Sequence, residues 1–234
     1  MKHLKNTFIF LFIIAFGITN AQTSTDKNSD EKAFGQGKMT LTVGYGFPNI
    51  YKAIFKSSYA NTSTSNNSPY SNSSESFNTK GIGPAFLKFE YGLNKVVAIG
   101  ASIGYYNFTL TETDSYTSYS SYNGTYASYV DTYKWYYSSF SAGVRINFHF
   151  ATGKKLDPYA GIAGGYSSNK YILTQTSTDP NNILPPPQTY SGILPVYFAL
   201  TAGLRYYFTP NIGAYLEVGI DKWSVIQGGL AFKF

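Results

Sequence analysis

Histidine is the side chain best suited to acid–base catalysis near neutral pH, and the sequence contains two, His3 and His149. His149 lies between Phe148 and Phe150, and no acidic or hydroxyl residue flanks it closely in the sequence. A catalytic imidazole needs a group that orients it or a nucleophile that it activates. We therefore interpret His149 as a polar interior residue rather than a catalytic base.

Three further patterns invite a chemical interpretation, and each has a simpler one. The glycines of GIAGG (161–165) resemble a phosphate-binding loop, but no strand-to-helix transition follows, so we expect them to make room for large neighbours. The absence of cysteine excludes disulfides and thiolate metal sites, and we expect no metal or cofactor. Asn-x-Ser/Thr triplets, which we interpret as loop composition, begin at Asn61, Asn66, Asn72, Asn107 and Asn123.

The first 21 residues predict export from the cytoplasm. Lys2 and Lys5 precede a short apolar core at 7–18, and Thr19 and Ala21 place small residues before a cleavage site. This is the pattern of a cleaved signal peptide, and the core is too short for a spanning helix. The next segment, 22–36, is polar, and we expect a mobile leader there.

Composition favours a β-rich protein that does not bind nucleic acid. Charged residues make up 13% of the chain, about half of the roughly 25% typical of soluble domains, whereas aromatic residues reach 18%. Tyrosine, phenylalanine and glycine in such numbers favour strands over helices. The formal net charge of +6 is spread along the chain, so no basic surface for nucleic acid is indicated.

The remainder of the chain, 37–234, alternates apolar and polar residues with a period of two. Met39, Leu41 and Val43, for example, alternate with threonines and other small or polar residues. Short links at 92–95, 151–158 and 209–211 alternate with long Ser-, Thr- and Asn-rich stretches at 48–81, 111–129 and 173–192. Short turns at one end and long loops at the other are typical of transmembrane β-barrels. The pattern predicts eight strands, at about 37–47, 82–92, 95–110, 130–150, 156–172, 193–208, 210–220 and 223–234.

Every second segment ends with the same motif, an aliphatic residue followed by two aromatics at alternate positions. The four endings are LKFEY, INFHF, LRYYF and LAFKF, and the last one closes the sequence. Aromatic residues on one face at one end of every second strand indicate a girdle at a membrane interface. We expect this periplasmic girdle to contain Phe89, Tyr91, Phe148, Phe150, Tyr206, Phe208, Phe232 and Phe234.

The opposite face of the same strand ends is polar and charged. A soluble barrel would also alternate, but soluble cores seldom bury charges at matched positions. We therefore predict a charged interior in which Glu90 and Glu217 are compensated by bases, because an isolated buried charge costs several kcal/mol. The candidate interior network is Lys88, Glu90, Arg145, Arg205, Glu217 and Lys233.

With its signal peptide, eight segments, PYAGIAGGY (158–166) and the C-terminal strand GGLAFKF, the chain resembles the small OmpA/OmpX-like outer-membrane barrels of Gram-negative bacteria. The resemblance covers about residues 37–234. It implies an all-β, eight-stranded antiparallel up-and-down transmembrane barrel, a monomer in contact with outer-membrane lipid, with short periplasmic turns and long extracellular loops. It also implies that the last strand, ending at Phe234, is recognised by the barrel-assembly machinery. Enzymes of this fold need a histidine near the external rim, where this sequence has none, so we expect no enzyme.

The segment between Thr111 and Tyr129 suggests a surface function. It contains no Val, Ile, Leu or Phe, yet strand-forming Thr and Tyr flank Asn123-Gly124, a strong hairpin signal. We predict that the third and fourth strands continue beyond the membrane as a hairpin. Its tyrosines, which could bind an extracellular protein or glycan, are Tyr116, Tyr119, Tyr122, Tyr126 and Tyr129. The alternatives are a loop that only shields the surface, and a narrow pore for small solutes.

Overall fold

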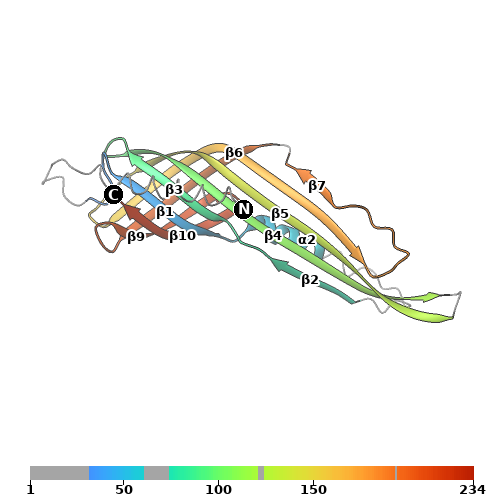
Figure 1. Ribbon diagram of the computed structural model, residues 1–234. Coiled ribbons are helices and arrows are strands. Elements are labelled where there is room, and N and C mark those ends of the chain that lie inside the picture. Colours follow the sequence, from blue (N-terminus) through green and yellow to red (C-terminus); the bar gives the residue numbers. More distant parts are fainter. Residues whose placement is uncertain (1–31, 61–73, 121–123, 193) are drawn as a thin grey trace, which may run out of the picture.

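The computed structural model describes residues 32–60, 74–120, 124–192 and 194–234, and these form a closed antiparallel barrel (Figure 1). The first strand pairs with the last, and the terminal residue Phe234 exchanges backbone hydrogen bonds of 2.9 and 3.1 Å with Met39. The eight-stranded barrel predicted from the sequence is therefore confirmed. In order around the wall its strands are β1 (Met39–Phe47), β3 (Ala85–Gly92), β4 (Val97–Ser120), β5 (Thr125–His149), β6 (Leu156–Ser177), β8 (Val196–Tyr207), β9 (Ile212–Asp221) and β10 (Ser224–Lys233).

Three further elements lie in stretches that we expected to be loops. Helix α2 (Ile50–Ala60) follows β1, whereas β2 (Ser74–Lys80) pairs with the upper part of β4 and β7 (Gln188–Ser191) pairs with β6. The expectation of irregular loops is wrong for these residues. No helix in the described part of the chain is long and apolar enough to cross a bilayer.

Strands β4 and β5, of 24 and 25 residues, form the predicted hairpin, and the neighbouring strand β6 is nearly as long at 22 residues. They pair without a register shift from Val97 opposite Phe148 to Ser120 opposite Thr125, and the end of this ladder lies beyond the described ends of β2 and β6 (Figure 1). The predicted tip at Asn123 lies outside the described residues. An uninterrupted ladder of this length makes the hairpin a rigid continuation of the barrel wall.

Burial alternates along the strands within the barrel, and the buried positions hold charged and polar residues as well as aromatic ones. On β5, Arg145 and His149 are each 1% exposed, whereas Val144 is 57% and Phe148 is 50% exposed. A soluble protein shows the opposite arrangement, with charged groups outside and apolar groups inside. The barrel therefore encloses charged and polar groups together with aromatic side chains, whereas its outer surface is apolar.

Glycines let large side chains fit inside the narrow barrel. A Cβ at Gly203 would lie 2.5 Å from the ring of Tyr159, and one at Gly161 would overlap the amide of Asn147. This agrees with our expectation for Gly161 in the GIAGG stretch. Gly164 differs, because it faces outward and a Cβ there would have no heavy atom nearer than 3.8 Å.

Candidate functional site

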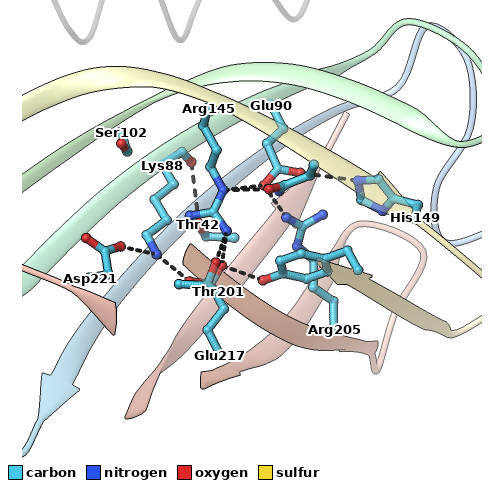
Figure 2. A network of polar contacts seen from close by, with 12 residues as sticks. Thr42, Lys88, Glu90, Ser102, Arg145, His149, Thr201, Arg205, Glu217 and Asp221 are labelled. Carbon is cyan, nitrogen blue, oxygen red and sulfur yellow. Dashed lines mark hydrogen bonds and ion pairs between the residues drawn. The ribbon is translucent and has the colours of Figure 1, made fainter. Parts of the chain in front are cut away.

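The half of the lumen nearer the short turns contains a network of buried ion pairs (Figure 2). Its first centre is Glu217 on β9. Glu217 Oε2 lies 2.5 Å from Lys88 Nζ, and its Oε1 lies 2.6 Å from Arg145 Nη2. Lys88 also lies 3.1 Å from Asp221 Oδ2 and donates to Gln227 Oε1 at 2.6 Å. Each cation at this centre thus meets a carboxylate, and the contacts join β3, β5, β9 and β10 across the lumen.

Glu90 on β3 is the second centre of the network. Its Oε1 lies 2.5 Å from Arg205 Nη2 and 3.6 Å from Arg145 Nε, so Arg145 connects the two centres. Arg205 Nη1 also lies 3.1 Å from Asp157 Oδ2. His149 lies between the two carboxylates, with Nδ1 2.7 Å from Asp157 and Nε2 3.7 Å from Glu90. The sequence showed no nearby partner for His149, and the fold provides two.

Tyr159 stands between the two centres. Its hydroxyl donates to Glu217 Oε1 at 2.7 Å, and the guanidinium carbon of Arg205 lies 4.2 Å from the centre of its ring. Such cation–π contacts stabilise a desolvated guanidinium. The lumen is therefore filled by side chains that pair in ion pairs and hydrogen bonds, although some of their buried atoms, Arg145 Nη1 and Arg205 Nε among them, have no hydrogen-bond partner. Within the described residues, no three His, Cys, Asp or Glu side chains are arranged to hold a metal ion.

Five of the six residues chosen for the interior network come together, and Lys233 does not. The Lys233 ammonium lies 4.7 Å from the ring of Tyr207 and 3.4 Å from the carbonyl of Lys32, near the mouth of the barrel. Asp157 and Asp221 were missed, because both lie in stretches that we read as turns. Period two counted forward from Glu217 would have found Asp221, which faces the lumen from the same strand.

A short segment before β1 covers the network at this mouth. Ala33 and Phe34 are 1% and 3% exposed, and Ala33 N donates to Gly153 O at 2.8 Å. The Phe34 ring stacks on His149, with ring centroids 3.4 Å apart and planes 5° apart. The expectation of a mobile leader is therefore wrong for this part of 22–36. Phe34 separates His149 from the solvent beyond the mouth.

The eight aromatic residues of the predicted girdle lie on the outer surface at the end of the barrel where the strands meet short turns. Phe89, Phe232 and Phe234 are half-buried, and the other five are 41–56% exposed. A second aromatic band, which the sequence analysis missed, lies on the outer surface near the hairpin end. Its members are Tyr45, Phe47, Tyr105, Phe140, Tyr166, Phe198 and Trp223.

The described hairpin tyrosines form two pairs on opposite faces. Tyr116 and Tyr129 pair on one face with ring centroids 5.8 Å apart, and Tyr119 and Tyr126 pair on the other at 5.0 Å. Tyr119 and Tyr126 are 56% and 76% exposed. Tyr122 lies outside the described residues. The hairpin thus presents one tyrosine pair on each of its two faces and does not form a single tyrosine patch.

Lower on the hairpin, Tyr133 faces the same side as Tyr129. Burial, together with the carboxylates of Asp131, Asp114 and Glu112, raises the pKa of Tyr133, because a phenolate there would be desolvated and repelled. Its hydroxyl is therefore neutral at physiological pH.

No family model and no curated protein matches the chain. Among solved structures it is similar to the N-terminal β-barrel domain of Pseudomonas aeruginosa OprF, at 15% identity and a TM-score of 0.38 over 86% of this chain and 100% of that domain. It is also similar to Ail, the attachment invasion locus protein of Yersinia pestis. The Ail complex with the heparin analogue sucrose octasulfate matches at 15% identity and a TM-score of 0.38, over 85% of this chain and 99% of that one. A second Ail structure gives 14% and 0.33 over the same shares. Matches at these levels do not assign the chain to a family.

Proposed function

We propose that the chain is an integral outer-membrane barrel without enzymatic activity that presents the β4–β5 hairpin at the cell surface for binding. The apolar outer surface between the two aromatic bands supports the location. Phe140 and Phe150 mark the two bands on one strand and are about the 9–11 residues apart that a transmembrane strand needs. At a rise of about 3.3 Å per residue and a tilt of about 40°, this separation corresponds to a band about 25 Å tall.

The filled lumen favours a surface role over transport or catalysis. A water-filled channel needs interior space, and an eight-stranded barrel is only just wide enough for its own side chains. Here Arg145, Arg205 and Tyr159 occupy that space, each at most 1% exposed. His149 is equally buried and is covered by Phe34, so a substrate has no route to it from the mouth beside Phe34.

The proposal that the hairpin binds a partner rests on the outer edges of β4 and β5 near its tip. Among the described residues, β2 pairs with β4 only as far as Ser115, and β6 pairs with β5 only from Asp131 downward. Asn107 N donates to Ile82 O, on the side of β4 away from β5. Since orientation alternates along a strand, the backbone groups of Thr117 and Tyr119 point to the same side, away from β5.

The same reasoning applies to the β5 edge. Val130 O accepts from Thr178 N, on the side away from β4, so the backbone groups of Tyr126 and Ser128 point outward as well. Natural sheets usually protect such edges with Lys, Pro or bulges. The stretch from Ser115 to Val130 has no charge and no proline. An extended segment of a protein partner can therefore add to the hairpin as a further strand, with the tyrosine rings as side-chain contacts.

Replacing Thr117–Ser128 with Asn-Gly tests this function, because it joins the paired residues Tyr116 and Tyr129 with a two-residue turn. The barrel should still reach the membrane, while cells carrying the variant lose adhesion to arrays of immobilised extracellular proteins and glycans. Unchanged adhesion would contradict the binding role and would leave the hairpin only a shielding role at the cell surface.

A matched proline pair separates strand addition from a general need for the hairpin. Thr117→Pro removes an outward N–H and should abolish protein binding with the hairpin intact. Ser118→Pro removes an N–H used between β4 and β5 and should disrupt the hairpin itself. Binding that survives Thr117→Pro but not removal of the tip would favour recognition by the tyrosine rings, as in a glycan site.

A further inference from the structure

A cleft of about 400 Å³ lies on the outer surface where β1 ends, α2 begins and β2 gives way to β3. Its volume is within the roughly 300–1,000 Å³ of ligand-binding clefts. Neither the interior network nor the hairpin tip contributes to it. The described residues that line it are Tyr45, Gly46, Phe47, Pro48, Asn49, Lys52, Ala53, Lys56, Gly81, Gly83 and Asn107.

The lower wall of the cleft is apolar and continuous with the membrane-facing surface. Tyr45 and Phe47 point outward from β1 and are 51% and 70% exposed, and Val43 below them is 47% exposed. Gly83 N donates to the Tyr45 hydroxyl at 2.7 Å, which holds this ring against the β2–β3 junction. A Cβ at Gly83 would lie 2.6 Å from the same hydroxyl oxygen, so a side chain there would displace Tyr45.

The upper wall of the cleft is cationic. Helix α2 starts after Asn49, whose Oδ1 accepts from Lys52 N at 3.0 Å as an N-cap. Lys52 and Lys56 are one helical turn apart and both line the cleft. The described lining contains no Asp or Glu, so the charge of this wall is positive. The cleft thus places an apolar wall at the outer aromatic band and two ammonium groups above it.

We propose that this cleft binds an anionic lipid of the outer leaflet, with an acyl chain along Tyr45 and Phe47 and its phosphate at Lys52 and Lys56. The site rests on the proposed membrane location. Charge complementarity selects a phosphate over a neutral headgroup, because Lys side chains attract anionic lipids at a membrane surface. A soluble anion would use only the upper wall and leave the apolar one without a partner. The cleft faces the outer leaflet because it lies at the end of the barrel opposite Phe234.

The full mature chain in phosphatidylcholine nanodiscs allows a direct test with fluorescent lipid A, an acylated glucosamine phosphate lipid, as the probe. Lys52→Ala/Lys56→Ala should weaken binding by roughly tenfold to thirtyfold, since each Lys near a membrane surface contributes a factor of roughly five. Lys134→Ala/Lys170→Ala is the matched control. It also removes two exposed lysines from the outer side of the wall, but neither lines this cleft, so binding should be unchanged.

Two further probes define the ligand. Dephosphorylated lipid A should bind as weakly as lipid A does to the double-lysine variant, and inorganic phosphate alone should not compete. Phe47→Ser should weaken lipid A binding without altering barrel formation. Equal binding to both double-lysine variants, or competition by inorganic phosphate, would overturn the lipid site. Failure of every variant and of the native chain to insert into the bilayer would instead refute the membrane location.

Discussion

Glu217→Gln should destabilise the barrel by about 3 kcal/mol. The carboxylate is 1% exposed and lies 2.5 and 2.6 Å from two cations, so the amide keeps the shape but leaves those cations undercompensated. Removing one partner of a buried ion pair typically costs about 3–5 kcal/mol. We expect the lower end of that range because Lys88 keeps Asp221 at 3.1 Å and Arg145 keeps Glu90 at 3.6 Å.

The loss can be measured by urea unfolding of the barrel in lipid vesicles, followed by the gel mobility of unheated samples. Lys134→Gln, an uncharging change at an exposed position of β5, is the control and should shift stability by less than about 0.5 kcal/mol. A loss below about 1 kcal/mol for Glu217→Gln would refute a dry lumen, since that is the value of solvent-screened pairs.

Three further predictions concern the ends and the lumen of the barrel. Phe34→Ala should make His149, the only histidine in the sequence besides His3, much more reactive toward diethylpyrocarbonate, whereas equal reactivity would mean that the Phe34 ring does not shield it. Deleting Phe234 should lower the amount of barrel in the outer membrane more than the stability of the finished barrel, because the last strand is the expected recognition segment; normal membrane levels would contradict this role. In planar bilayers the native chain should show no conductance or only a very small one, because salt-bridged side chains fill the lumen, and large stable steps would favour transport.

The strands and their two faces could be predicted because the pleat fixes a period of two. This period placed Glu217 inside and Phe148 outside without knowledge of any contact. The same rule, applied within the hairpin, separates Tyr116 from Tyr119, which are three residues apart and so face opposite ways. The interior pairing could not be predicted, because which strand faces which across the lumen depends on the shear of the barrel.

The missed elements have weak local signals. Strands β2 and β7 lie in segments rich in Ser, Asn and Pro, whose propensities favour turns, so tertiary contacts decide their structure. Helix α2 does have a local start signal in Asn49, which was overlooked because 48–81 was assigned as one loop. Asp157 precedes a proline in a stretch with turn residues, where an acidic side chain ordinarily indicates a solvated loop. Phe34 was overlooked because one aromatic residue in a polar segment has no periodicity from which burial could be inferred.

The contacts at Lys88 also constrain the order in which the barrel can form. Its partners Glu217 and Gln227 are 129 and 139 residues away in the sequence, and Gln227 lies on the last strand. Contacts of such high sequence separation form slowly, because the intervening chain must first be ordered. Before β9 and β10 have joined the barrel, Lys88 has no carboxylate partner. An open intermediate in lipid would therefore contain an uncompensated ammonium group as well as unpaired backbone N–H and C=O groups. Ring closure and charge neutralisation are therefore coupled, and half-closed barrels should be too short-lived to accumulate during refolding.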